Sequence, residues 1–109
     1  MEAAGSPGMR DFLSFPKSVI VRDKGYLRRV AELPCSWCGI EGYSQAAHVP
    51  PEGKGIKQSD YETFPLCCTR PGVIGCHVDY DQYRLMPDSQ EARRQGRQWA
   101  FSTRERLGA

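Results

Sequence analysis

Both histidines of the chain stand within a framework of cysteines. His48 lies between the pair Cys35–Cys38 and the later cysteines Cys67 and Cys76, and His77 directly follows Cys76. Thiolates and imidazoles are the ligands that zinc prefers in proteins. A neutral histidine near pH 7 can also take a proton from water. The pattern therefore indicates a structural zinc site with a second, chemically active site beside it.

Four of the five cysteines can supply a tetrahedral zinc site. Cys35 and Cys38 are spaced to bind one ion from a single turn. We expect Cys67 and Cys76 to complete the set. Cys68 competes with Cys67, because two adjacent cysteines cannot easily both point at one ion. The alternative is a redox-active Cys-x-x-Cys or plain buried cysteines, but the flanks of this turn lack the strand–helix context of a redox site.

The two histidines and one carboxylate fit the needs of phosphodiester hydrolysis. The reaction requires an activated water, neutralisation of charge on the phosphorane and help for the leaving 3′ oxygen. His48, at the end of an expected strand, can act as the general base. His77 and Asp81, one turn apart on an expected helix, can hold a divalent ion that serves the other two needs. The alternatives are an ordinary structural role or zinc ligation for His48, zinc ligation by His77 in place of Cys76, and a surface role for Asp81.

Local signals place these residues on a small number of elements. Periodicity, capping residues and helix breakers predict an extended segment over 12–21 and a helix over 23–31 with Asp23 as its cap. Two strands are predicted over 45–49 and 61–66, followed by a helix over 76–85. A last helix is predicted from the capping box Asp88–Glu91 to about Arg106, with Gly108 beyond it.

Size and composition favour a single intracellular domain. The chain has 109 residues, and no apolar run approaches the ~18 residues of a membrane span. Its first residues lack the basic start and apolar stretch of a secretory signal. We therefore expect a cytoplasmic protein without a membrane partner, in which the cysteines bind metal instead of forming disulfides.

Charge is distributed unevenly, although the net charge is only +2. Residues 33–89 carry seven acidic and four basic side chains, whereas residues 90–109 carry five arginines and two glutamates. This distribution suits a metal-dependent enzyme that holds phosphates from its edges, although a solvated helix face explains it equally well. Lys54, Lys57 and Arg70, on loops near the expected site, are candidate phosphate contacts.

The order Cys-x-x-Cys, Ala-His, Pro-Leu-Cys and Cys-His-x-x-x-Asp resembles the HNH, or ββα-metal, endonucleases. It is most similar to a small phage and prophage branch associated with recombination. The resemblance covers about residues 24–85. It implies that His48 is the general base, that His77 binds Mg²⁺, Mn²⁺ or another divalent ion, and that Asp81 replaces the last histidine of the motif. Ala47 departs from the pattern, because many members carry another metal ligand there.

The central asparagine of the motif is also not evident, and Asp60 or Thr63 lies in that region. Water, a substrate phosphate, Asp60 or Asp79 could complete the metal sphere. The expected fold is α+β, with a ββα-metal (HNH, His-Me finger) core stapled by a four-cysteine zinc site and flanked by N- and C-terminal helices. The expected division is a flexible or extended segment at 1–22, the nuclease core at 23–87 and a basic helix packed on it at 88–109.

The expected function is a metal-dependent DNA endonuclease, encoded by a phage or prophage. Its expected partners are DNA and a phage or host recombination protein. The alternative is a non-catalytic zinc-binding module that contacts nucleic acid or another protein. A zinc-dependent deaminase is disfavoured, since it would need a His-x-Glu motif and His48 is followed by Val49-Pro50.

Overall fold

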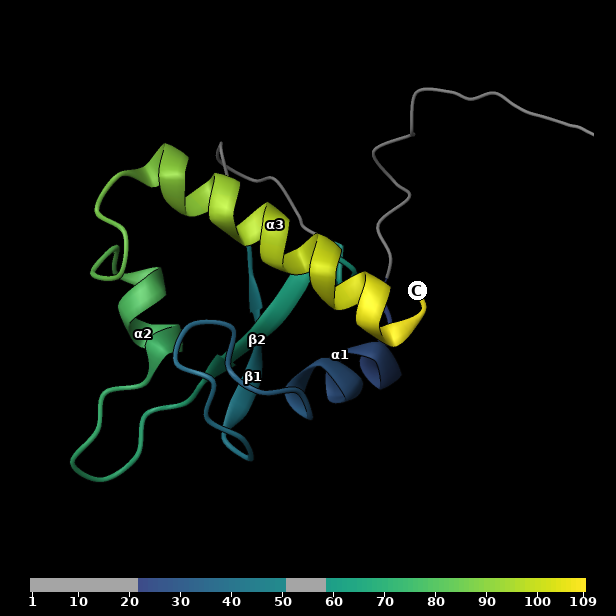
Figure 1. The fold of residues 1–109 in the computed structure, drawn as a ribbon, viewed down its shortest axis with the longest axis horizontal. Helices are drawn as coiled ribbons and strands as arrows, with labels where there is room; N and C mark the ends of the chain where they lie inside the picture. Colours follow the sequence, from purple (N-terminus) through teal and green to yellow (C-terminus); the bar gives the residue numbers. More distant parts are fainter. Residues whose placement is uncertain (1–21, 51–58) are drawn as a thin grey trace, which may run out of the picture.

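Three helices surround a two-stranded antiparallel sheet in the computed structural model, which describes residues 22–50 and 59–109 (Figure 1). The order of elements is α1 (Lys24–Ala31), β1 (Ser44–His48), β2 (Thr63–Cys67), α2 (Cys76–Asp81) and α3 (Ser89–Leu107). The fold is thus α+β, as predicted. The expectations for residues 1–21, and for Lys54 and Lys57, lie outside the described residues.

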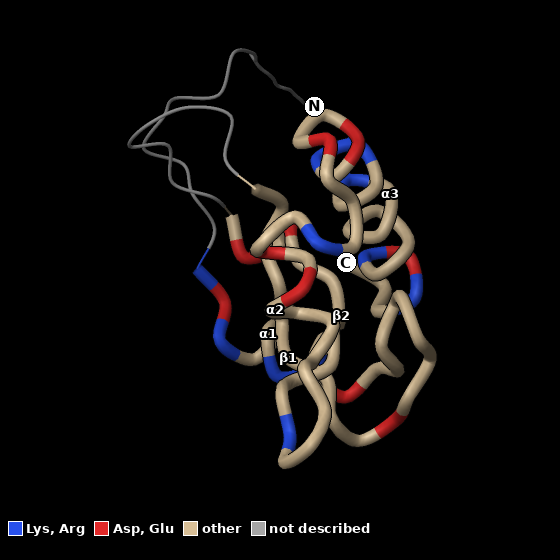
Figure 2. The backbone as a smooth tube through the Cα atoms, turned by 90° about the vertical axis from the view of Figure 1, so that its left-hand side faces the viewer, with Lys and Arg blue, Asp and Glu red and all other residues tan. Residues whose placement is uncertain are grey.

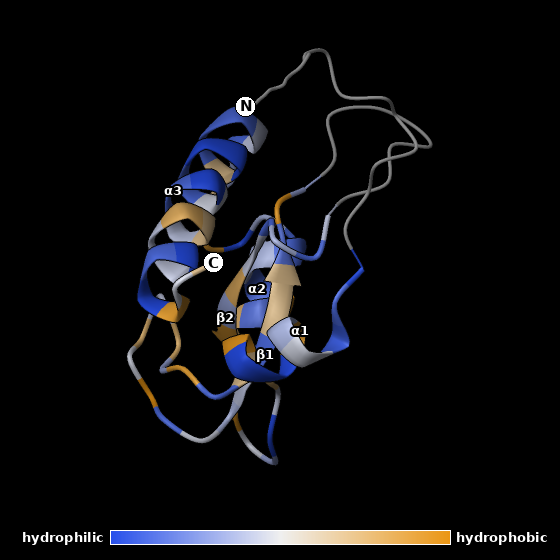
Figure 3. Ribbon diagram, turned by 90° about the vertical axis from the view of Figure 1, so that its right-hand side faces the viewer, coloured by the Kyte–Doolittle hydropathy of each residue, from blue (hydrophilic) through white to orange (hydrophobic). Residues whose placement is uncertain are grey.

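The two strands pair along their whole length, from Ser44 opposite Cys67 to His48 opposite Thr63. Every residue of β2 is buried, which requires cover on both faces of the sheet. Figures 1 and 3 show α1 on one side of the sheet and α2 on the other, with α3 crossing β2. The core therefore lies around β2, and its largest members are Phe64, Leu66 and Tyr80.

Helix α1 begins where the sequence predicts. The Asp23 carboxylate accepts a hydrogen bond from the Tyr26 backbone N–H at 3.0 Å, as an N-cap does. Tyr26 and Val30, four positions apart, form the buried face of the helix against the sheet. The helix ends at Ala31, three residues before Pro34.

Helix α2 is shorter than predicted. It ends at Asp81, not near residue 85. Tyr83 adopts a left-handed conformation with φ of 58°, so the helical hydrogen-bond pattern cannot continue through it. The N–H groups of Arg84 and Leu85 both turn back to the carbonyl oxygen of Asp79. The residues of chemical interest, at the start of the helix, are unaffected by this correction.

Helix α3 has the predicted caps with one difference. Asp88 caps it by accepting a hydrogen bond from the Gln90 N–H at 3.0 Å, and Gly108 ends it in the left-handed conformation. Glu91 does not close the predicted capping box, because its carboxylate pairs with Arg94. No helix of residues 22–50 and 59–109 combines the length and apolar character needed to cross a lipid bilayer.

Small residues let α3 approach the sheet closely. Ala92, Gly96 and Ala100 form a buried stripe along the helix. A Cβ atom on Gly96 would lie 2.4 Å from the Tyr80 hydroxyl oxygen and 3.3 Å from atoms of both Phe64 and Val49. Hence the middle of α3 rests directly on the end of β1 and the centre of β2.

Candidate metal centre and histidine sites

The first cysteine pair lies in a tight turn between α1 and β1. The Cys35 N–H donates to the Ile40 carbonyl at 2.9 Å, and the Gly39 N–H returns to the Cys35 carbonyl at 3.0 Å. The Cys38 N–H faces the Cys35 sulfur at 3.5 Å. Backbone hydrogen bonds therefore hold both thiols on the same side of the turn.

The second pair comes from the end of β2 and the start of α2. Cys67 is the last residue of β2 and Cys76 the first of α2, and the Cys76 N–H donates to the Cys67 sulfur at 3.3 Å. Gly75 makes this approach feasible, because a Cβ atom there would lie 2.3 Å from the carbonyl carbon of Cys68 and 2.5 Å from the Cys67 oxygen. Eight residues separate the two cysteines in the sequence, and the absence of a side chain at Gly75 lets this segment fold back so that they meet.

The four sulfur atoms of Cys35, Cys38, Cys67 and Cys76 all lie within 4.8 Å of one another. The Cys38 and Cys67 sulfurs are 3.9 Å apart, and a tetrahedral site with Zn–S bonds of about 2.3 Å needs roughly 3.8 Å between sulfurs. The cluster could therefore hold a metal ion such as zinc. Cys68 lies outside it.

Protonation of the cluster is set by burial and neighbouring donors. Burial raises the pKa of the Cys67 thiol, but the Cys76 N–H, the Arg70 guanidinium and neighbouring thiols together outweigh it and bring the pKa to about 7. Burial, and hydrogen bonds that the Cys76 thiol donates to Cys67 and Cys35, raise the pKa of the Cys76 thiol far above its usual value. Without a metal, Cys67 is accordingly the first of these two thiols to ionise, while a bound cation would favour the thiolate at both.

Arg70, a candidate phosphate contact, lies beside this cluster. Its guanidinium donates to the Cys68 carbonyl at 2.9 Å and lies over the Tyr43 ring at 4.5 Å. The pKa of the Arg70 guanidinium is raised, and the largest cause is its hydrogen bond with Cys67. These contacts give Arg70 a role in supporting the second cysteine pair, and a phosphate contact by it stays a prediction.

His48, at the end of β1, faces a buried carboxylate. Its Nε2 atom lies 3.8 Å from Oδ1 of Asp60, and the imidazole is about two-fifths exposed. Asp60 is itself buried, and its Oδ2 accepts the Asp23 N–H at 2.7 Å. Asp60 thus joins His48 to the N-terminus of α1. No local signal predicts this link, because 37 positions separate Asp23 from Asp60.

His77 and Asp81 come together as their one-turn spacing predicts. Nε2 of His77 lies 3.5 Å from Oδ2 of Asp81. The other ring nitrogen, Nδ1, lies 2.9 Å from the side-chain oxygen of Gln45 on β1. Asp79, the other acidic residue of α2, instead pairs with Arg84 at 2.8 Å. Asp79 is therefore engaged away from the histidines.

The two histidines occupy different sides of the sheet. Side chains alternate along a strand, so Gln45, which contacts His77, and His48 point to opposite faces. Consistent with this, His48 connects through Asp60 to α1, while His77 is part of α2. Within residues 22–50 and 59–109, the four cysteines are the one group of three or more His, Cys, Asp or Glu side chains placed to share an ion. His48 and the His77–Asp81 pair are two separate sites in this structure.

We found no match to the chain among the protein-family models, the curated proteins or the solved structures with which we compared it.

Proposed function

We propose that the protein is a metal-dependent DNA endonuclease of the HNH, or ββα-metal, type. The observation that carries the proposal is that both histidines lie beside carboxylates on a β–β–α unit: His48 beside Asp60, and His77 beside Asp81. A second support is the cysteine cluster, whose place between these elements suits a zinc ion that holds a small domain together.

His48 is the proposed general base. It takes a proton from water, the hydroxide attacks phosphorus, the P–O3′ bond breaks and the 3′ oxygen leaves as an alcohol after taking a proton from solvent. The Asp60 carboxylate, 3.8 Å from Nε2, favours an orientation of the ring and stabilises the imidazolium that forms. The partial exposure of the His48 side chain lets water reach it.

His77 and Asp81 are the proposed ligands of the catalytic ion. When the Nδ1–H of a histidine donates to an oxygen, here that of Gln45, the Nε2 lone pair remains available for a metal. That nitrogen is the one beside Asp81. A divalent ion there would neutralise phosphate charge and assist the leaving oxygen. Because the donors are one nitrogen and one oxygen, Mn²⁺ or Ni²⁺ fits them at least as well as Mg²⁺.

The proposed biological setting follows from the resemblance alone. The Cys-x-x-Cys, Ala-His, Pro-Leu-Cys and Cys-His-x-x-x-Asp order is similar to that of phage and prophage enzymes associated with recombination. A phage or host recombination protein would then direct the domain to DNA.

A second candidate function, a non-catalytic zinc module that binds nucleic acid, is favoured by one observation. Gln45 and His48 lie on opposite faces of β1, so the proposed metal pair and the proposed base do not form one cluster. Ala47, between them in sequence on the buried face, provides no ligand to join them.

Cleavage of supercoiled plasmid by the purified zinc-loaded protein tests the proposal. Mg²⁺, Mn²⁺, Ni²⁺ and EDTA would be compared for the native chain and for His48→Ala. The expected result is metal-dependent nicking that His48→Ala abolishes without loss of zinc or of folded structure. Absence of cleavage with every metal, from folded protein that still binds DNA, would favour the non-catalytic module.

Two substitutions on α2 separate the metal ligands from their neighbours. Asp81→Asn should raise the concentration of metal needed for half-maximal cleavage. Asp79→Asn is the matched control, because Asp79 is on the same short helix but pairs with Arg84. Equal effects of the two substitutions would contradict the assigned role of Asp81.

A further inference from the structure

The middle of α3 carries a basic face that is independent of the metal and histidine sites. Positions 92–104 contain four arginines (Arg93, Arg94, Arg97 and Arg104) and no Asp or Glu. Figure 2 shows this helix at one side of the molecule, with blue and red segments along it. The buried residues Ala92, Gly96, Ala100 and Thr103 fix which side of the helix meets the sheet. Arg94 and Arg97 are exposed on the other side, whereas Arg104 turns in to Tyr61 and Glu62.

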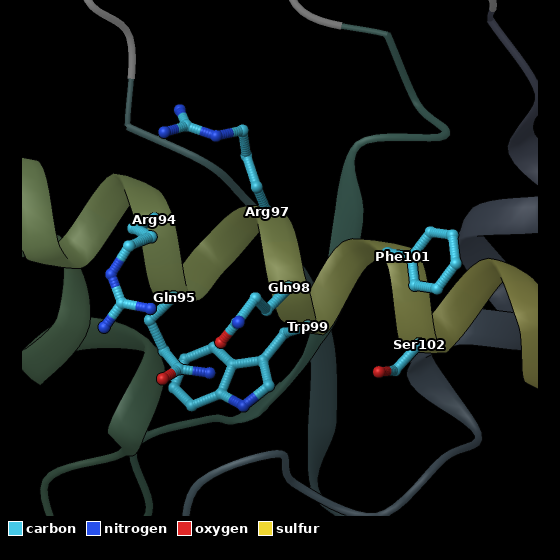
Figure 4. A pocket seen from close by; sticks show the side chains of 7 residues that line it. All are labelled: Arg94, Gln95, Arg97, Gln98, Trp99, Phe101 and Ser102. Atoms are coloured by element: carbon cyan, nitrogen blue, oxygen red, sulfur yellow. The ribbon is translucent and has the colours of Figure 1, made fainter.

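An open groove of about 540 Å³ runs along this outward side. Its lining is formed by two arginines, two glutamines, a serine and two aromatic rings, namely Arg94, Gln95, Arg97, Gln98, Trp99, Phe101 and Ser102 (Figure 4). All five polar members can donate hydrogen bonds, and none is acidic. A lining with this charge and these donors suits a ligand that presents anionic oxygens in a row.

The buried side of α3, opposite the basic face, packs on the residue that follows the strand carrying His48. Gly96, which directly precedes Arg97, is packed on Val49, which directly follows His48. The close contact lacks room for even a Cβ atom, so it fixes the register of α3 on the sheet. A polymer bound along the outward side of α3 would therefore be held on a helix whose position relative to β1 is fixed.

The ion pair of Arg94 does not block the groove. Arg94 contacts Glu91 one turn away, and both side chains are about half exposed. An exposed pair of this kind contributes little to stability. A phosphate can displace Glu91 from the guanidinium, since Arg binds phosphate through two parallel N–H donors.

We propose that this face of α3, centred on Arg94 and Arg97, binds the phosphate backbone of duplex DNA. The inference rests on the proposed function for its choice of DNA as the polymer. Arginine–phosphate contacts release counterions, so the binding is sequence-independent and weakens steeply with salt. Its role would be to hold the duplex on the protein during cleavage.

Fluorescence anisotropy with a labelled duplex in a series of salt concentrations tests this inference. All proteins carry His48→Ala and are zinc-loaded, so the duplex stays intact. The expected result is that Arg94→Gln with Arg97→Gln lowers affinity by about tenfold or more and reduces the slope of log K against log salt by roughly two. Circular dichroism verifies that each variant is folded.

The matched control is Arg28→Gln with Arg106→Gln. It removes the same charge from exposed positions on α1 and the last turn of α3, outside the groove. The control should change affinity by less than about threefold, because only long-range attraction is altered. Equal losses in both double variants, unchanged binding after the groove substitutions, or no binding by the His48→Ala parent would each overturn the inference.

The plasmid assay keeps this inference distinct from the nuclease proposal. If the parent binds through α3 but the native chain cleaves nothing, the binding face stands and the nuclease proposal fails. If the chain cleaves plasmid and the groove substitutions leave both KM and affinity unchanged, the nuclease proposal stands and the binding face fails.

Discussion

Trp37 and Trp99 meet edge to face, with ring centroids 6.4 Å apart and an angle of 79° between the ring planes. Trp37 is inside the Cys35–Cys38 turn, and Trp99 is on α3, where it also packs on Phe64 and Tyr80. The pair thus links the candidate metal centre to a helix that contributes no cysteine. Through this contact, order at the cysteine cluster supports the position of α3.

Removal of the metal should therefore be visible in tryptophan fluorescence, because the chain has only these two tryptophans. Structural zinc in small domains contributes about 10–16 kcal/mol, which is as large as the whole stability of a typical domain, about 5–15 kcal/mol. We expect a strong chelator to shift emission to longer wavelength and to lower the helical circular dichroism signal, with recovery on adding Zn²⁺. Unchanged spectra in protein proved to be metal-free would contradict a structural role for the metal.

Separate substitutions of the adjacent Cys67 and Cys68 should show which of them binds the metal. Cys67→Ser removes a sulfur of the cluster, and we expect the purified protein to lose bound zinc and to unfold at much lower temperature. Cys68→Ser changes the neighbouring residue, which is outside the cluster, and should retain one equivalent of zinc. Elemental analysis and thermal melts measure both effects. If Cys67→Ser retained zinc and Cys68→Ser lost it, Cys68 and not Cys67 would be the zinc ligand.

Gly96 should be intolerant of alanine, against the general preference of helices. Alanine in a helix interior usually gains about 1 kcal/mol over glycine. Here the new Cβ would lie 2.4 Å from the Tyr80 hydroxyl, and overpacking of this kind costs about 1–3 kcal/mol. We expect Gly96→Ala to lower the melting temperature. Gly25→Ala is the control in α1, where the Cβ would lie an ordinary 3.4 Å from Asp23; equal melting temperatures for the two variants would refute the steric argument.

The hydroxyl of Tyr80 should make stability depend on alkaline pH. Burial raises the pKa of Tyr80 above its usual value of 10.0, and its hydroxyl donates to the Ala92 carbonyl. A raised folded pKa stabilises the protein fully below the unfolded pKa, near 10, and this contribution is lost as pH rises beyond it. Tyr80→Phe should therefore be less stable than the native chain by about 0.5–1.5 kcal/mol near pH 7, with the difference shrinking above pH 10. Denaturant unfolding at several pH values measures the difference, and a constant gap would argue against this linkage.

The elements are predictable where local rules decide them. Asp23 and Gly108 fix the ends of α1 and α3 through their own backbone and side-chain preferences, and the four-residue spacing of His77 and Asp81 brings them onto one face. The sequence predicts too long a helix at α2, because nothing in it indicates that Tyr83 turns left-handed. The juxtaposition of the two cysteine pairs is predictable from ligand chemistry alone.

Other features depend on contacts between distant segments and could not be predicted. Asp60 approaches Asp23 and His48 only when α1 packs on the sheet. Gly96 likewise contacts Val49 only when α3 packs there. The separation of His48 from His77 follows from strand alternation at Gln45, but only the contact between Gln45 and His77 shows which face α2 covers. The sequence alone therefore could not show that the base candidate and the metal-ligand candidates lie apart.

Asp60 has a hydrogen-bonding role and a charge role that amide and alanine substitutions can separate. Its Oδ2 accepts the Asp23 N–H, and its Oδ1 lies 3.8 Å both from Nε2 of His48 and from a guanidinium nitrogen of Arg22. Asp60→Ala leaves a part-buried N–H without its acceptor, which costs about 1–3 kcal/mol and should lower the melting temperature by several degrees. Asp60→Asn keeps an oxygen for that N–H but removes the charge facing His48 and Arg22. Because the Arg22 side chain is 56% exposed, its ion pair contributes little to stability, so this variant should melt close to the native chain and cleave plasmid more slowly. Loss of stability in Asp60→Asn as large as in Asp60→Ala would show that the carboxylate charge, and not the hydrogen bond, anchors α1.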